Sequence, residues 1–189
     1  FQTRDGLTLH LNNWPAPQPR ARLLLVHGLG EHSGRYDALA RELNAQGISL
    51  RAFDHRGHGR SQGMRGVVGK EAACLSRDTT EIFNAYAAES GDVPFLLGHS
   101  MGGLVVMHAV AEQRLRPRGL IASSPALASH AGAFDRLLSK LLLHVAPDLT
   151  VANGLPADRL SHAAGVERTY LDDPLNHNRI SARLARYIF

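Results

Sequence analysis

Short, continuous apolar runs recur along the first two thirds of the chain, separated by longer stretches of mixed residues. The runs cover residues 22–26, 48–53, 93–97 and 119–123. Apolar runs of this length are typical of parallel strands that are buried on both faces of a sheet. Between them, apolar residues recur at helical spacing and predict helices before Gly47, over residues 72–89 and over residues 101–113. This alternation predicts an α/β fold, a mostly parallel sheet with right-handed crossovers and helices on both faces.

The segments around the first buried run have their own patterns. Residues 7–14 alternate apolar and polar positions and are followed by a proline-rich stretch over residues 15–19, which predicts an edge strand and a turn. In the first helix, Ser33 suits the N-cap position, and Gly47 suits the left-handed position that ends a helix.

The pattern changes after Pro125. Residues 134–145 carry apolar side chains at helical spacing, and the stretch from there to Asp173 shows no strand alternation. We interpret residues 1–125 as the core and residues 126–189 as a helical cap region over the carboxyl ends of the strands, where open α/β sheets place their sites. The alternative is an ordinary surface helix of the sheet layer. The last residues, 180–189, are predicted to be helical.

Composition narrows the class of protein. The 189 residues are 44% hydrophobic and 20% charged, which suits one globular domain. Cys74 is the single cysteine, so an internal disulfide or a multi-thiolate zinc site is excluded, and we expect a buried thiol. No apolar stretch approaches the roughly 20 residues of a membrane helix, and we expect a soluble, cytoplasmic protein. The net charge is only +4, and the arginines are spread along the chain, so we expect no nucleic-acid binding.

The strongest chemical signal is the segment Gly98-His-Ser100-Met-Gly102-Gly, which lies between a predicted buried strand and a predicted helix. In this G-x-S-x-G context the serine stands on a tight turn with its hydroxyl above the sheet. Gly98 and Gly102 leave room for the strained backbone. The N-terminus of the helix points at the same spot, so the N–H of Met101 can stabilise an oxyanion. The alternative interpretation is a simple strand-to-helix turn.

A second glycine-containing turn follows an earlier strand. His27-Gly28-Leu29-Gly30 would bring backbone N–H groups to the same sheet edge, and Leu29 would supply a second oxyanion donor. We expect His27 to be a structural hydrogen-bonding residue, and the side chain of His99 to point away from the serine.

Three motifs occur together in order, at residues 27–36, 54–61 and 98–103: HGLGEHSGRY, DHRGHGRS and GHSMGG. With them the chain resembles the α/β-hydrolase family of monoacylglycerol lipases and lysophospholipases, from about Asp5 to Tyr187. The resemblance implies hydrolysis of a monoacylglycerol, lysophospholipid or similar monoacyl ester through an acyl-enzyme. It makes Ser100 the nucleophile and gives the oxyanion hole to the backbones of Leu29 and Met101. It requires no cofactor and no metal.

The same resemblance implies that the chain lacks the last third of the domain, including the acid and the histidine of a triad. We do not reassign those roles to residues of the predicted cap, which we expect to be solvated or packed. These residues are Asp148, Asp158, Asp172, Asp173, His130, His144, His162 and His177.

Other features keep two interpretations. We expect the loop with His55 and His58 to be structural, bracing the serine turn; a metal site that joins them to His27 and His32 has no supporting ligand spacing. The apolar face of the cap could line an acyl channel or rest on a membrane surface beside Arg136 and Lys140, or could simply pack on the sheet. That face comprises Phe134, Leu137, Leu138, Leu141 and Leu142.

Fold alone does not decide function, so competing functions stay open. A cofactor-free peroxidase or a thioesterase uses the same kind of turn. A non-catalytic fragment or binding scaffold would need neither acid nor base.

Overall fold

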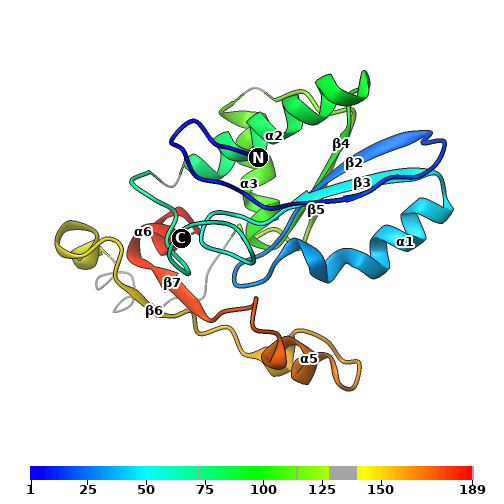
Figure 1. The fold of residues 1–189 in the computed structure, drawn as a ribbon. Helices are drawn as coiled ribbons and strands as arrows, with labels where there is room; N and C mark the ends of the chain where they lie inside the picture. Colours follow the sequence, from blue (N-terminus) through cyan, green and yellow to red (C-terminus); the bar gives the residue numbers. More distant parts are fainter. Residues whose placement is uncertain (72, 114, 128–139, 189) are drawn as a thin grey trace.

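The computed structural model describes residues 1–71, 73–113, 115–127 and 140–188 (Figure 1). Its main body is a five-stranded sheet in the order β1-β3-β2-β4-β5. The strands are β1 (Leu11–Trp14), β2 (Ala21–Val26), β3 (Ile48–Phe53), β4 (Phe95–His99) and β5 (Leu120–Ser123). β1 pairs antiparallel with β3, and the other pairs are parallel. The mostly parallel sheet and the edge strand before the proline-rich stretch are therefore confirmed.

Helices cover both faces of this sheet, as predicted (Figure 1). They are the short 3₁₀ helix η1 (Ser33–Tyr36), α1 (Asp37–Ala45), α2 (Cys74–Ser90) and α3 (Met101–Ala111). The alternation of side chains along β2 separates two cores, because successive strand residues face opposite sides. Leu24 and Val26 pack in the cluster with α2 and α3, whereas Leu23 and Leu25 pack with Ala40 of α1. Cys74 is a buried free thiol, as predicted.

The start of the first helix differs from the prediction. Ser33 does not cap α1, because η1 precedes it and Tyr36 holds the N-cap position without a side-chain bond. The Ser33 hydroxyl instead donates to Asp54 Oδ1 at 2.5 Å, which ties the helix entry to the end of β3. His32 caps η1 through Nδ1, which accepts from the N–H of Gly34. Gly47 does end the helix, with φ +70°.

Residues 140–188 hold a second, small sheet. β6 (Thr150–Ala152) pairs antiparallel with β7 (Arg179–Ser181), so the prediction of a stretch without strands was wrong. Strands of three residues are too short to leave an alternation pattern. The prediction of a helix from residue 180 was wrong at its start, because β7 takes residues 180–181 and α6 (Ala182–Ile188) begins after them. The remaining elements are η2 (Ala157–Arg159), α5 (Val166–Asp172) and a helical segment at residues 140–145.

This second region has a buried end and an exposed end. Ile180, Leu184 and Ala185 belong to the main core cluster and anchor β7 and α6 to it. Large apolar side chains between residues 141 and 171 are instead 45% to 73% exposed. They are Leu141, Val145, Leu149, Val151, Leu155, Leu160 and Leu171. Three residues of the predicted apolar cap face, Phe134, Leu137 and Leu138, lie outside the described residues, as do the flanking Arg136 and His130.

In the part of the chain that the structure describes, no helix combines the length and apolarity needed to cross a bilayer.

Candidate active site

Ser100 occupies a strained turn between β4 and α3. Its backbone has φ 53° and ψ −119°, a combination that an L-residue adopts at a cost of about 1–3 kcal/mol. Hydrogen bonds hold the turn in place. The N–H of Ser100 donates to the carbonyl of Ser123 at 2.9 Å, and its own carbonyl accepts from the N–H groups of Leu104 (3.3 Å) and Ala126 (3.1 Å). The strained conformation is thus imposed by β5 on one side and by α3 on the other.

The glycines beside Ser100 allow helix and sheet to touch backbone to backbone. A Cβ at Gly98 would lie under 3.0 Å from the carbonyl oxygen of Gly102, and a Cβ at Gly102 would lie under 3.0 Å from that of Val26. This confirms the role predicted for both glycines. Gly103 also lies close to a neighbouring segment, since a Cβ built at this position would lie 2.9 Å from Pro125.

The loop after β2 lies against the serine turn. A Cβ at Gly28 would be 3.3 Å from the Cβ of Ser100. His27 makes structural hydrogen bonds, as expected: Nδ1 donates to the carbonyl of Gly28 at 2.7 Å, and Nε2 accepts from the N–H of His55 at 2.9 Å. The second bond requires an unprotonated Nε2, which places the proton on Nδ1.

The two predicted oxyanion donors are the N–H groups of Leu29 and Met101. Within the described residues, neither donates to a carbonyl across a turn or loop. The side chain of Met101 is buried in the main core, and Leu29 packs against the same cluster. His99 contacts the hydroxyl of Ser123 at 3.1 Å and not Ser100, which agrees with the prediction that it points away.

Glu31 is a central residue of this loop that the sequence reasoning missed. Its Oε1 accepts from the N–H of Gly28 and from the hydroxyl of Tyr36, each at 2.7 Å. Its Oε2 accepts from Arg35 at 2.5 Å. Burial raises the pKa of Glu31, but the hydrogen bonds from the Gly28 N–H and the Tyr36 hydroxyl and the charge of Arg35 outweigh that effect and lower it, so the carboxylate stays ionised. A buried acid inside a glycine-rich turn was the signal that could have revealed it.

The loop at residues 54–61 makes structural contacts with the loop after β2, and the bracing of the serine turn expected of it stays a prediction. Asp54 accepts from the N–H of Ser33 at 2.7 Å and from the N–H of Arg60 at 2.8 Å. His55 and His58 lie beside His27, with ring centroids 4.6 Å and 5.4 Å from it. Burial lowers the pKa of all three imidazoles. Among the described residues, no three His, Cys, Asp or Glu side chains are arranged to hold a metal ion.

Two residues of the predicted cap touch the loop after β2, and one of them also reaches His58. Asp173 bonds Nε2 of His32 at 2.8 Å. The ring centroid of His177 lies 4.5 Å from that of His58, and the backbone N–H of His177 donates to the carbonyl of Gly30 at 2.9 Å. Both therefore have packing roles. Asp148 and Asp172 pair with arginines at the surface, and Asp158, His144 and His162 are exposed.

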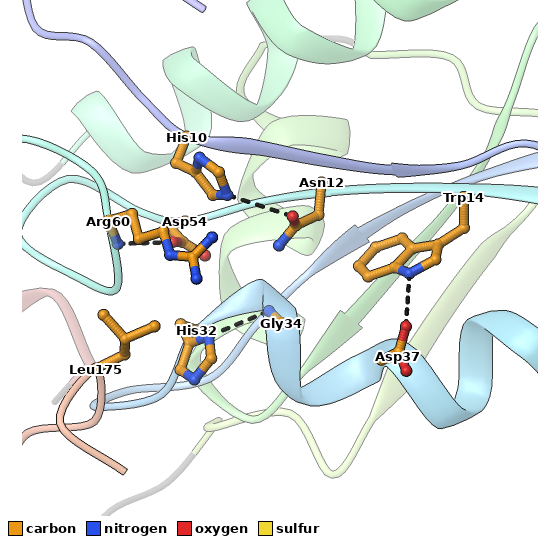
Figure 2. Close-up of a pocket in the computed structure, with 9 residues that line it drawn as sticks. All are labelled: His10, Asn12, Trp14, His32, Gly34, Asp37, Asp54, Arg60 and Leu175. Atoms are coloured by element: carbon orange, nitrogen blue, oxygen red, sulfur yellow. Dashed lines mark hydrogen bonds between the residues drawn. The ribbon is translucent and has the colours of Figure 1, made fainter.

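A cavity of about 230 Å³ opens between β1 and η1 (Figure 2). Its lining includes none of Ser100, Leu29 and Met101. The polar side chains that line it largely bond one another, such as Trp14 Nε1 to Asp37 at 3.0 Å. It is therefore separate from the candidate active site. The lining residues are His10, Asn12, Trp14, His32, Gly34, Asp37, Asp54, Arg60 and Leu175.

A strained serine between a parallel strand and a helix, facing a glycine turn, is a recognisable arrangement. The Hydrolase_4 family model, described as serine aminopeptidase S33, matches residues 17–189. The chain belongs to this α/β-hydrolase family. The family resemblance and the fold predicted from the three motifs are thereby confirmed.

Relatives of this α/β-hydrolase include several lipases. It is 36% identical to the monoglyceride lipase of Rattus norvegicus over 90% of the chain, and 34% identical to the monoacylglycerol lipase of Mycolicibacterium smegmatis over 98%. The crystal structure of Paleococcus ferrophilus monoacylglycerol lipase superposes with a TM-score of 0.83 and 38% identity over 96% of the chain. The chain spans 57% of the rat protein, 68% of the mycolicibacterial protein and 69% of the Paleococcus chain.

Proposed function

We propose that this α/β-hydrolase is a serine-dependent ester hydrolase that acts on monoacylglycerols or similar monoacyl esters. The observation that carries the proposal is Ser100 in a strained strand-to-helix turn, with the Gly28–Leu29 turn against it. The names of the similar proteins from rat, Mycolicibacterium and Paleococcus support the substrate class.

In the proposed mechanism, the Ser100 hydroxyl attacks the carbonyl carbon of the ester and forms a tetrahedral intermediate. The N–H groups of Leu29 and Met101 stabilise the negative oxygen. Collapse of the intermediate breaks the bond to the leaving alcohol and leaves an acyl-enzyme, which water then hydrolyses to the free acid and Ser100. A histidine must take the serine proton and pass it to the alcohol, and a carboxylate must orient it. Those two groups would come from the part of the relatives' length that this chain does not span.

The exposed apolar side chains between residues 141 and 171 fit a lipid substrate. Leu141 and Val145 are 62% and 73% exposed, which makes this helical segment a candidate to line the acyl path or to meet a lipid surface briefly. Helices with an exposed apolar side and neighbouring cations such as Lys140 bind at the surface of lipid membranes. Residues 126–189 would then act as the cap.

The test combines chemical labelling with turnover. Intact mass before and after treatment with a fluorophosphonate should show one adduct at Ser100, and the same preparation should hydrolyse p-nitrophenyl esters and a monoacylglycerol. Ser100→Ala should abolish the adduct and reduce turnover by about 10⁴-fold or more.

The matched control is Ser76→Ala, a buried serine of α2 whose hydroxyl bonds the carbonyl of Ala73 at 3.0 Å. It should keep both the adduct and the activity. Activity retained in Ser100→Ala would remove Ser100 from the mechanism. Absence of both adduct and turnover in the wild type would favour the non-catalytic binding scaffold, and turnover only with peroxide would favour the peroxidase.

A further inference from the structure

The direction of the Leu29 N–H is set by an atom on the other side of the same peptide bond. The carbonyl of Gly28 and the N–H of Leu29 belong to one planar trans unit, so they point in opposite directions. Nδ1 of His27 donates to that carbonyl at 2.7 Å. Anything that rotates this peptide plane re-aims the proposed oxyanion donor.

Glu31 holds the other peptide of Gly28. Its Oε1 accepts the Gly28 N–H at 2.7 Å, so the glycine is gripped on both sides. The fit is tight, because a Cβ at Gly28 would meet Oε1 of Glu31 at 3.0 Å and the Cβ of Ser100 at 3.3 Å. The carboxylate, the glycine and the serine turn therefore form one packed stack.

The carboxylate of Glu31 is itself fixed in place. It is only 6% exposed and is held by the Tyr36 hydroxyl at 2.7 Å and by Arg35 at 2.5 Å. Arg35 lies in turn over the ring of Tyr170, 4.8 Å from its centroid. A buried carboxylate that accepts from three donors is a rigid support, because its negative charge strengthens each of the three hydrogen bonds.

We propose that Glu31 is a positioning residue that aims the Leu29 N–H at the oxyanion formed on Ser100; the inference rests on the proposed function. Without the carboxylate, the buried Gly28 N–H has lost its acceptor, and the turn changes conformation so that this N–H can reach a different acceptor. The donor then misses the developing charge. Because the oxyanion exists only in the transition state, the loss falls on kcat and leaves KM close to its wild-type value.

The experiment uses the form of the enzyme that labels with the fluorophosphonate. Glu31→Ala should lower kcat on a p-nitrophenyl ester by about 10- to 100-fold, a fraction of what a lost oxyanion donor costs. A trifluoromethyl ketone, which binds as a serine hemiketal oxyanion, should lose affinity by a similar factor. Glu31→Gln keeps an oxygen that can accept the Gly28 N–H and should recover most of both losses. Asp37→Asn, a nearby carboxylate that bonds Trp14 and Arg41, should leave kcat unchanged.

A purely structural role for Glu31 predicts something else. The melting temperature would fall while kcat of the folded enzyme and the ketone affinity stayed at wild-type values, and that result would overturn the proposal. If Glu31→Ala does not fold, Tyr36→Phe removes one support of Oε1 and should lower kcat and ketone affinity together by about threefold; no change in either would also overturn it. A wild type without ester turnover would instead refute the proposed function.

Discussion

Glycine has one role in the serine turn and a different role in the stretch from residue 140 to residue 172. At the serine turn, Gly98 and Gly102 have no positive φ and are needed because another backbone occupies the space of a Cβ. In the second stretch, Gly154 and Gly165 have φ of +69° and +83°, and nothing lies within 4 Å of a Cβ built there. The first region depends on glycine for its packing, whereas the second depends on it only for a turn. This difference separates a closely packed strand-to-helix turn from a loosely packed stretch of chain.

The largest expected loss of stability comes from a substitution in the closely packed serine turn. Gly102→Ala forces a methyl group into the carbonyl of Val26, and neither α3 nor β2 can shift without disturbing the Ser100 turn. We expect a loss of more than about 4 kcal/mol of unfolding free energy, enough to prevent folding. Denaturant unfolding followed by circular dichroism measures it.

The matched variant in the other region is Gly154→Ala. It carries only the cost of a left-handed alanine, about 1–2 kcal/mol. Equal losses for the two variants would contradict the contrast between the regions.

The second expected effect compares two ion pairs. Arg56 is 3% exposed and bonds Asp78 through Nε and Nη2, each at 2.8 Å, and also Asp5. Asp78→Asn leaves a buried guanidinium without its main counter-charge, and we expect a loss of about 3 kcal/mol or more.

The pair in the second region is Arg183 with Asp148, which is 50% exposed and 3.2 Å away. Asp148→Asn should cost less than about 1 kcal/mol, because solvent screens an exposed pair. Urea titrations of both variants test the comparison; a larger loss for Asp148→Asn would show that the second region is the better supported one.

The same contrast explains what could be predicted from the sequence. The runs that became β2 and β3 and the serine turn were recognisable, because burial on both faces and close backbone approach restrict residue types locally. The β6–β7 pair was not, since three-residue strands that meet across 26 intervening residues leave no local pattern. The hydrogen bond from the Gly28 N–H to Glu31 could not be predicted either, because it depends on the path of a loop. Ser33 was assigned to a helix cap for the same reason, because its actual partner, Asp54, lies in the loop that follows β3.

After the losses expected for Gly102→Ala and Asp78→Asn, the next smaller effect concerns the contact between the two regions at His177. Burial, with the charge of Arg65 adding to it, lowers the pKa of His177 to about 4. Between pH 6.5 and pH 4 the unfolded chain therefore binds a proton at this residue that the folded chain does not, and the unfolding free energy falls as the pH falls. For His177 alone the difference between pH 7 and pH 4.5 is about 2 kcal/mol, because one pKa unit corresponds to about 1.4 kcal/mol.

His177→Gln tests this pH dependence. The informative quantity is the slope of the unfolding free energy against pH, and not the stability at any one pH. The variant loses the packing against His58 and should be less stable at pH 7, but its unfolding free energy should fall less steeply on acidification, with the gap to the wild type narrowing by about 2 kcal/mol at pH 4.5. His27, His55 and His58, which have lowered pKa values too, keep part of the slope in both proteins. Parallel curves would mean that His177 is protonated equally in the folded and unfolded chains, so that the contact between the regions is open in solution. A converging pair of curves would show that residues around His177 stay docked on the loop that carries Leu29.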